Sequence, residues 1–180
     1  KRVVDINLMG VLHGVYASLP LLKATKNSLL FTTSSSSATY GMPRIAVYAA
    51  TKFAVKGLTE ALSIEFARHG VRVADTLPGL IDTAILSNTP NHSGDMPQAR
   101  SAADIAETAP KKGMFRLMPA MSVAEAVWAS YHDTKGKLHW YVPKEIGRID
   151  KAKAISPEFV RKRIMKGITA RMIQAAKRGG

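Results

Sequence analysis

Cysteine is absent from the 180-residue sequence. Its absence excludes disulfide bonds, cysteine-based zinc sites and a thiol nucleophile, and gives no support for an oxidising compartment. No stretch reaches the roughly 20 uncharged apolar residues that span a bilayer, which argues against a transmembrane helix and favours a cytoplasmic protein. The five histidines lack the spacing of a zinc motif such as H-E-x-x-H, so we predict no metal site. A serine hydrolase is disfavoured because the G-x-S-x-G turn is missing.

The N-terminus lacks a starting methionine and a basic-then-apolar leader. The chain instead opens inside an amphipathic pattern, KRVVDINLMGVLHGVYASLPLLK. We therefore expect this sequence to be the C-terminal part of a longer polypeptide.

Positive charge is unevenly distributed. The formal net charge is +13, and residues 144–180 carry eleven Lys/Arg against three Asp/Glu, whereas residues 1–143 carry fifteen against ten. We accordingly divide the chain into a domain, 1–143, and a basic amphipathic helical tail, 144–180. The tail is most simply a solvated helix that packs one face on the domain or on a sister subunit. An anionic membrane surface contacted through residues 151–178 is the sharper alternative. Nucleic acid is disfavoured, because no recognition fold or aromatic platform accompanies the charge.

Apolar periodicity predicts helix over 3–23, strand over 28–33, helix over 46–69 and strand over 71–77. This alternation implies parallel strands joined by helical crossovers, and hence an α/β sheet. Residues 84–118 are expected to form a long loop. Beyond it we predict a helix opened by a capping box, Ser122 to Glu125, and ending near residue 131. A strand over 138–143 and a helix over 157–177 complete the prediction.

The strongest chemical signal is the pair Tyr48 and Lys52. Positions four apart lie on one face of a helix, so the phenol and the ammonium should point the same way. A nearby fixed positive charge favours the phenolate and so lowers the ordinary tyrosine pKa of about 10. Such a pair can give or take a proton at a carbonyl or carbinol oxygen.

Further motifs surround this pair in a fixed order. Asn7 lies on the first predicted helix, Ser35 follows the first strand in the run Ser34–Ser37, and Pro78, Gly79 and Thr83 follow the second strand. This ordered set resembles the short-chain dehydrogenase/reductase family over about residues 3–86. The resemblance implies a Rossmann-like, doubly wound parallel sheet, here represented by its C-terminal strands and helices.

The resemblance also implies a role for each matching residue. Tyr48 would be the general acid/base, and Lys52 would lower its pKa and hold the nicotinamide ribose. Ser35 would hydrogen-bond the substrate oxygen, and Asn7 would anchor a water in the proton relay. The remaining cofactor-lining positions would be Pro78, Gly79 and Thr83. For Ser36 and Ser37 a solvated flexible turn is the simpler interpretation.

The activity so implied is an NAD- or NADP-dependent oxidoreductase that interconverts an alcohol and a ketone or aldehyde, and works as a homodimer or homotetramer. An apolar small-molecule substrate is expected, because residues 84–121 offer a lid of apolar side chains: Met96, Ile105, Met114, Phe115, Leu117, Met118 and Met121. The family's glycine-rich phosphate loop has no counterpart, since the thirteen glycines are scattered. Because of that departure, an alternative function stays open: the chain is a truncated or non-catalytic module that acts in binding or assembly. Such a module would contact membranes through the basic tail.

Overall fold

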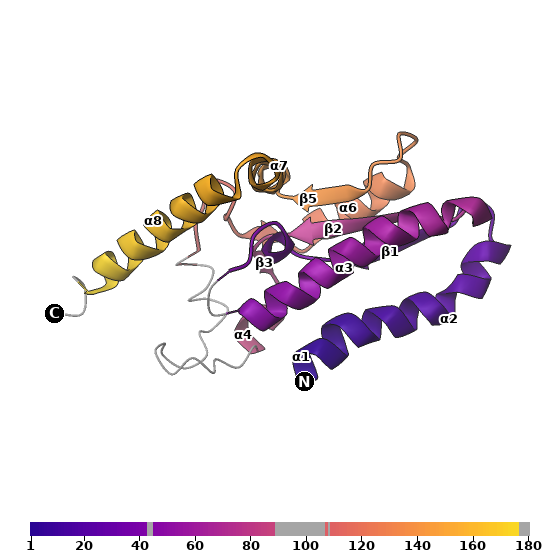
Figure 1. Ribbon diagram of the computed structural model, residues 1–180, viewed down its shortest axis with the longest axis horizontal. Coiled ribbons are helices and arrows are strands. Elements are labelled where there is room, and N and C mark those ends of the chain that lie inside the picture. The colour runs from indigo at the N-terminus through magenta and orange to yellow at the C-terminus, as the bar shows by residue number, and fades with distance from the viewer. Residues whose placement is uncertain (43–44, 89–106, 108, 177–180) are drawn as a thin grey trace.

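The computed structural model describes residues 1–42, 45–88, 107 and 109–176, and the side chains of 87–88 and 167–176 lie outside that description. Helices and strands alternate along the first half (Figure 1). In chain order the elements there are α1 Arg2–Val4, η1 Asp5–Met9, α2 Gly10–Ala24, β1 Leu29–Thr33, η2 Ser36–Ala38, α3 Ala46–Glu65, η3 Ala67–His69 and β2 Arg72–Pro78. The alternation predicted from periodicity is confirmed.

The first helix is continuous from α1 to α2, with one wider turn, η1, of π-helical geometry. Pro20 lies inside α2 and does not end it. Arg2–Ala24 is also long and apolar enough to cross a membrane, by length and composition alone. A mostly buried core helix of a globular protein passes the same test, but this helix is largely exposed: of Arg2–Ala24 only Val15 is buried, where it packs in the core cluster with Leu30 and Val73.

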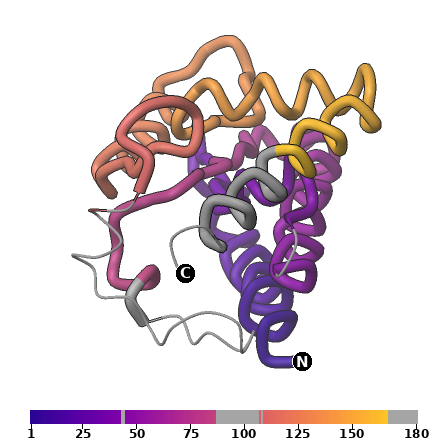
Figure 2. The backbone as a smooth tube through the Cα atoms, turned by 90° about the vertical axis from the view of Figure 1, so that its left-hand side faces the viewer, coloured from indigo at the N-terminus to yellow at the C-terminus, as the bar shows by residue number. Residues whose placement is uncertain are grey.

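A parallel sheet with strand order β1-β2-β5 forms the centre, where β5 is His139–Val142. Leu30 pairs with Val73, and Thr76 pairs with Trp140. Helices α2 and α3 lie side by side along one face (Figure 2). The core cluster on that face consists of Val15, Leu30, Leu62, Phe66, Val71 and Val73.

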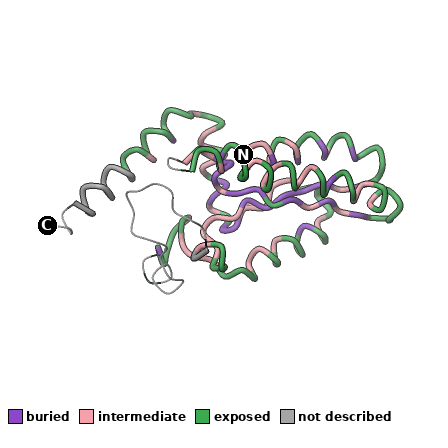
Figure 3. Tube along the Cα trace, turned by 90° about the horizontal axis from the view of Figure 1, so that it is seen from below, coloured by how far each residue is buried: buried purple, intermediate pink, exposed green. Residues whose placement is uncertain are grey.

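The other face of the sheet packs against α6, Met121–Tyr131. Leu29 and Phe31, which alternate with the core residue Leu30, line a hollow together with Trp128 and Tyr131 of α6. Helices on both faces leave the strands as the most buried part of the molecule (Figure 3). This arrangement confirms the predicted Rossmann-like class and places the carboxyl ends of the strands at one edge.

The segment after β2 is less regular. It contains a pair of short parallel strands, β3 Ile81–Asp82 and β4 Met118–Pro119, and a short helix, α4 Ile85–Asn88. Most of the predicted 84–118 loop, with its apolar residues Met96 and Ile105, lies outside the described residues.

One prediction about a helix start in the C-terminal part is corrected. Helix α6 begins at Met121, so Ser122 lies inside it and no side-chain cap is formed; the capping box is wrong. Residues 144–155, which show no clear period, form η4 Lys144–Ile146 and α7 Gly147–Ile155, and the predicted tail helix follows as α8 Pro157–Ala176. Burial of Ile146 and Val160 anchors this tail to the domain.

Candidate functional site

Lys52 connects helix α3 to the carboxyl end of strand β1. Its Nζ donates a hydrogen bond to the carbonyl oxygen of Thr33, the last residue of β1, at 2.9 Å. Nζ also lies 5.7 Å from the centroid of the Tyr48 ring, one helical turn earlier. Burial lowers the pKa of Lys52. The ammonium is therefore fixed beside the phenol ring at the edge of the sheet where ligands bind in this class of fold.

Asn7 reaches the same turn of α3 through Thr51. The Asn7 side-chain amide donates to Thr51 Oγ1 at 3.3 Å, and that hydroxyl donates to the Tyr48 carbonyl oxygen at 2.7 Å. Asn7 lies in the π-helical turn η1, a feature often found at functional sites. The contact ties the first helix to the turn that carries Tyr48 and Lys52.

The serine run follows β1 directly and is largely buried. Ser35 Oγ accepts a hydrogen bond from the Ser37 backbone N–H at 3.1 Å and so caps the short turn η2. Its own hydroxyl proton has no acceptor among the residues that the structure describes. The predicted solvated turn at Ser36 and Ser37 is wrong, because Ser37 is buried and the two residues form the first positions of η2.

Besides Tyr48 and Lys52, the three remaining candidate cofactor residues lie at or beyond the end of β2. Pro78 is the last residue of that strand, and Gly79 N–H donates to the Val142 carbonyl at 2.7 Å. A Cβ on Gly79 would stand 2.9 Å from Ile146 Cδ1, so glycine permits close packing there. Thr83 is exposed, and its carbonyl accepts from the Leu86 N–H at 3.0 Å.

Two contributing residues escaped the sequence analysis. Ser34 Oγ donates to the Lys52 backbone carbonyl at 2.9 Å, and Thr51 bridges Asn7 and Tyr48. Ser34 was hidden in a run of four identical residues, and Thr51 resembles any polar helical residue. Burial of these two polar side chains would have identified them, but burial cannot be read from a single sequence.

A second polar cluster lies farther along α3, between that helix and strands β2 and β5. Asp75, with no exposed surface, accepts from or donates to His139 Nδ1 at 2.8 Å, and His139 Nε2 lies 3.2 Å from Glu60 Oε1. Asp150 accepts from Lys56 Nζ and from the Tyr141 hydroxyl, each at 2.6 Å. Sequence analysis missed this cluster, although an aspartate inside an otherwise apolar strand was its visible sign.

An open parallel sheet covered by helices, with a tyrosine and a lysine fixed at its carboxyl edge, defines an α/β protein of the Rossmann-like class. Comparison with known proteins makes this more specific. The sequence profile of the family described as short chain dehydrogenase matches residues 1–94, which is just over half of the chain. The chain belongs to the short-chain dehydrogenase family, as the motifs predicted.

Curated relatives match the same region. An uncharacterized oxidoreductase of Listeria innocua is 41% identical over 88 residues, which are 48% of this chain and 36% of that protein. A cyclohexanol dehydrogenase of an Acinetobacter species is 32% identical over 87 residues, which are 48% of this chain and 35% of that protein. The match thus spans little more than a third of these relatives' length.

Solved structures resemble a larger part of the fold. A short chain dehydrogenase of Burkholderia cenocepacia in complex with NADP has a TM-score of 0.66 at 24% identity, covering 88% of this chain and 56% of that one. A 3-oxoacyl-[acyl-carrier protein] reductase of Brucella melitensis has a TM-score of 0.57 at 27% identity, covering 78% and 50%. The chain spans about half the length of these proteins.

Proposed function

We propose that the protein is an NAD(P)-dependent oxidoreductase that interconverts an alcohol and a ketone or aldehyde. The observation that carries the proposal is the position of Lys52, whose ammonium joins the carboxyl end of β1 to the Tyr48 ring. Support also comes from two relatives by their names, the cyclohexanol dehydrogenase and the dehydrogenase bound to NADP.

The donors at this edge fit the nicotinamide end of the cofactor. An ammonium has three N–H donors, and only one of those on Lys52 has a partner among the described residues, the Thr33 carbonyl. The other two suit the hydroxyls of a ribose. Tyr48 and Lys52 would therefore hold the ribose, and Pro78, Gly79 and Thr83 would line the nicotinamide. When bound, the nicotinamide supplies or accepts the hydride.

The residues of the chain handle the proton. In the direction of reduction, the Tyr48 hydroxyl gives its proton to the carbonyl oxygen, and the Ser35 hydroxyl donates a hydrogen bond to the same oxygen. Lys52 stabilises the phenolate that remains, because it is a cation beside the ring. Asn7 positions the water that returns a proton to Tyr48. In the direction of oxidation each transfer runs backwards.

Turnover of the whole protein with NAD⁺ or NADP⁺ and cyclohexanol, followed by absorbance of the reduced nicotinamide, tests the proposal. Tyr48→Phe should lower kcat by at least about 100-fold, since it removes the acid/base group. Tyr131→Phe on α6 is the matched control and should leave kcat unchanged. Full activity in the Tyr48→Phe variant would refute the mechanism. Absence of turnover with every alcohol tried would favour the non-catalytic binding module.

A homodimer or homotetramer is the assembly that we propose, through the outer faces of α2 and α3. These faces expose Tyr16 at 84%, Leu21 at 72% and Ile64 at 79%. Large exposed apolar side chains gathered on neighbouring helices are typical of association surfaces. Sedimentation as a monomer at micromolar concentration would contradict this assembly.

Contact with an anionic membrane surface through the tail is the second candidate function. Ile155 and Phe159 are exposed at the α7–α8 junction, close in sequence to the cations Lys162, Arg163 and Lys166. Apolar side chains flanked by cations favour binding to anionic lipid. Co-sedimentation with phosphatidylserine vesicles should be lost in Phe159→Ser; equal sedimentation with neutral vesicles would argue against the candidate.

A further inference from the structure

The turn that follows β2, residues 78–83, is held between two later segments of the chain. On one side Gly79 packs against η4, where a Cβ on the glycine would stand 2.9 Å from Ile146 Cδ1. On the other side strand β4 runs beside β3, and the Met118 N–H donates a hydrogen bond to the Leu80 carbonyl at 2.9 Å. The turn that contains the remaining candidate cofactor residues is therefore in contact with η4 and with β4.

One ion pair joins η4 directly to the segment before β4. Arg116 Nη1 donates to Glu145 Oε1 at 2.9 Å. Glu145 immediately precedes Ile146, and Arg116 lies two positions before Met118. The contacts consequently form a closed ring: the turn 78–83 touches η4, η4 is bonded to Arg116, and the segment of Arg116 returns to the turn.

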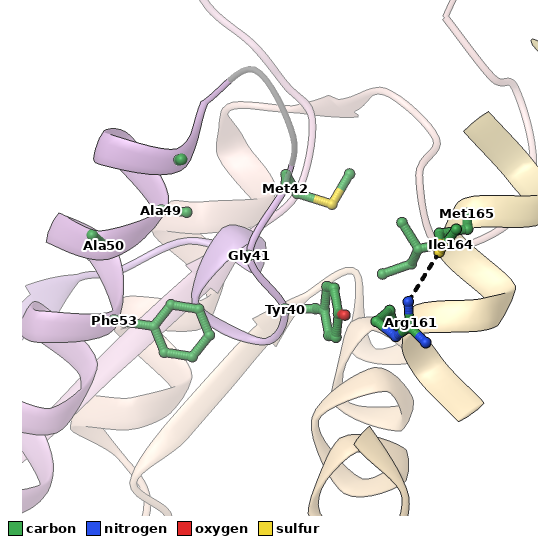
Figure 4. Close-up of a pocket in the computed structure, with 10 residues that line it drawn as sticks. Tyr40, Gly41, Met42, Ala49, Ala50, Phe53, Arg161, Ile164 and Met165 are labelled. Atoms are coloured by element: carbon green, nitrogen blue, oxygen red, sulfur yellow. Dashed lines mark hydrogen bonds between the residues drawn. The ribbon is translucent and has the colours of Figure 1, made fainter. Parts of the chain in front are cut away.

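Arg116 has stronger acceptors than Arg161, an arginine of α8. Its Nη1 also donates to the Gly113 carbonyl at 2.9 Å, and the two partners of the ion pair have side chains 28% and 35% exposed. The pKa of Glu145 is lowered, first by a hydrogen bond from its own backbone N–H and then by Arg116, so the carboxylate is charged at neutral pH. Arg161 Nη1 donates to the Met165 sulfur at 3.4 Å, and a thioether is a weak acceptor (Figure 4). Arg116 is thus the more firmly held of these two arginines.

We infer that Arg116 and Glu145 are positioning residues, whose ion pair holds the turn 78–83 in the conformation that receives the nicotinamide. Without the pair, η4 and the segment before β4 can separate, and the turn must be ordered when the nucleotide binds. Ordering a loop on binding lowers affinity. The pair should thus act on nucleotide affinity and leave the proton transfer by Tyr48 unchanged. The inference rests on the proposed function in taking the turn as cofactor-lining, whereas the order of the turn can be measured without any nucleotide.

Binding of NADH and NADPH to the whole protein, followed by nucleotide fluorescence, is the first test. Arg116→Gln and Glu145→Gln should each weaken binding about fivefold, the upper range for a partly exposed ion pair, with kcat at saturating nucleotide unchanged. The two variants change the net charge in opposite directions. The direct effect of charge on an anionic nucleotide would therefore weaken binding in Arg116→Gln and tighten it in Glu145→Gln. The reversed pair, Arg116→Glu with Glu145→Arg, should restore most of the affinity. Lys112→Gln, at an exposed position of the same segment, is the matched control and should bind as the parent does.

Amide hydrogen exchange of the nucleotide-free protein, resolved by NMR, is the second test. The Gly79 and Met118 N–H groups form the hydrogen bonds on the two sides of the turn, and both Gln variants should speed their exchange about fivefold. The Ser34 N–H, which donates to the Thr76 carbonyl at 2.9 Å, should exchange as in the parent. Equal acceleration at all three amides would show a loss of overall stability and would overturn the positioning role.

Parent-like exchange at Gly79 and Met118 in both variants would also overturn the inference, as would tighter nucleotide binding by Glu145→Gln. The outcome is separable from that of the proposed function. A parent that binds no nucleotide, with faster exchange in both variants, refutes the proposed function alone. An active parent whose variants bind nucleotide as tightly as it does refutes this inference alone.

Discussion

Lys52 and Lys56 leave helix α3 one turn apart, yet their ammonium groups have partners of different charge. Lys52 Nζ donates to a neutral carbonyl, that of Thr33, at 2.9 Å. Lys56 Nζ donates to the Asp150 carboxylate at 2.6 Å and lies 4.0 Å from Glu60 Oε1. Among the described residues, no carboxylate forms an ion pair with Lys52.

The difference separates a structural lysine from one available to a ligand. The charge of Lys56 is balanced within the protein by the carboxylate of Asp150. The two side chains are largely buried, with exposed fractions of 14% and 16%. The charge of Lys52 is not balanced, and burial lowers the pKa of Lys52 because the charged form is partly deprived of water. A cation kept at some cost to stability beside a phenol is typical of a functional site.

Replacing each lysine by methionine should therefore affect different properties. Lys52→Met has the larger expected effect, on activity. It should lower kcat/KM with NAD(P) about 100-fold, because hydrogen bonds from a charged donor contribute about 1.5–3 kcal/mol. NADH binding, followed by fluorescence, should weaken in parallel. The free energy of unfolding should change little, and a large loss of stability with unchanged NADH affinity would refute the distinction.

Lys56→Met should act on stability instead. Removing one partner of a largely buried ion pair leaves Asp150 with the Tyr141 hydroxyl as its remaining close donor. We expect the free energy of unfolding in urea to fall by about 2 kcal/mol. Turnover per folded molecule should match the parent. Lys151→Met, at an exposed position of α7, is the control and should be neutral.

Elements and contacts that depend on local sequence could be predicted from the sequence alone. Strands β1, β2 and β5 were predicted almost to the residue because their apolar runs end in serine or proline. The helix predicted over 46–69 begins where expected but ends at Glu65, and the separate turn η3, which Gly70 caps with a left-handed φ of 68°, occupies the rest. The Tyr48–Lys52 pair was found because both residues belong to one element. Contacts within one helix follow from helical spacing.

Contacts between elements were not predictable in the same way. Lys56 and Asp150 are 94 positions apart, and Asp75 and His139 are 64 apart. Nothing local in the sequence couples such residues, since their meeting depends on strand order and register. The tail 144–180 was predicted to be helical, but its separate elements in 144–155 were not, for a related reason: buried Ile146 and the contact of Tyr141 with Asp150 hold η4 and α7, rather than a strong helical period.

Asp75 is a further buried ionisable residue that can be compared with Lys52 and Lys56. Only one of its two carboxyl oxygens has a partner among the described residues. Its Oδ1 contacts His139, whereas its Oδ2 is buried and has no partner among the described residues. Burial raises the pKa of Asp75 above its ordinary 3.8, and the hydrogen bond from His139 opposes that effect. A raised carboxyl pKa means that the folded protein binds this proton more tightly than the unfolded chain.

The stability that this proton contributes is complete below pH 3.8 and is lost as pH rises toward the higher folded pKa. Asp75→Asn stays neutral at every pH and can still accept from His139. It should therefore gain stability relative to the parent between pH 4 and pH 7, by about 1 kcal/mol, measured by urea unfolding at each pH. Asp82→Asn, at an exposed position of β3, is the control and should follow the parent. Loss of stability in Asp75→Asn at pH 7 would instead show that the ionised carboxylate, through its contact with His139, stabilises the sheet.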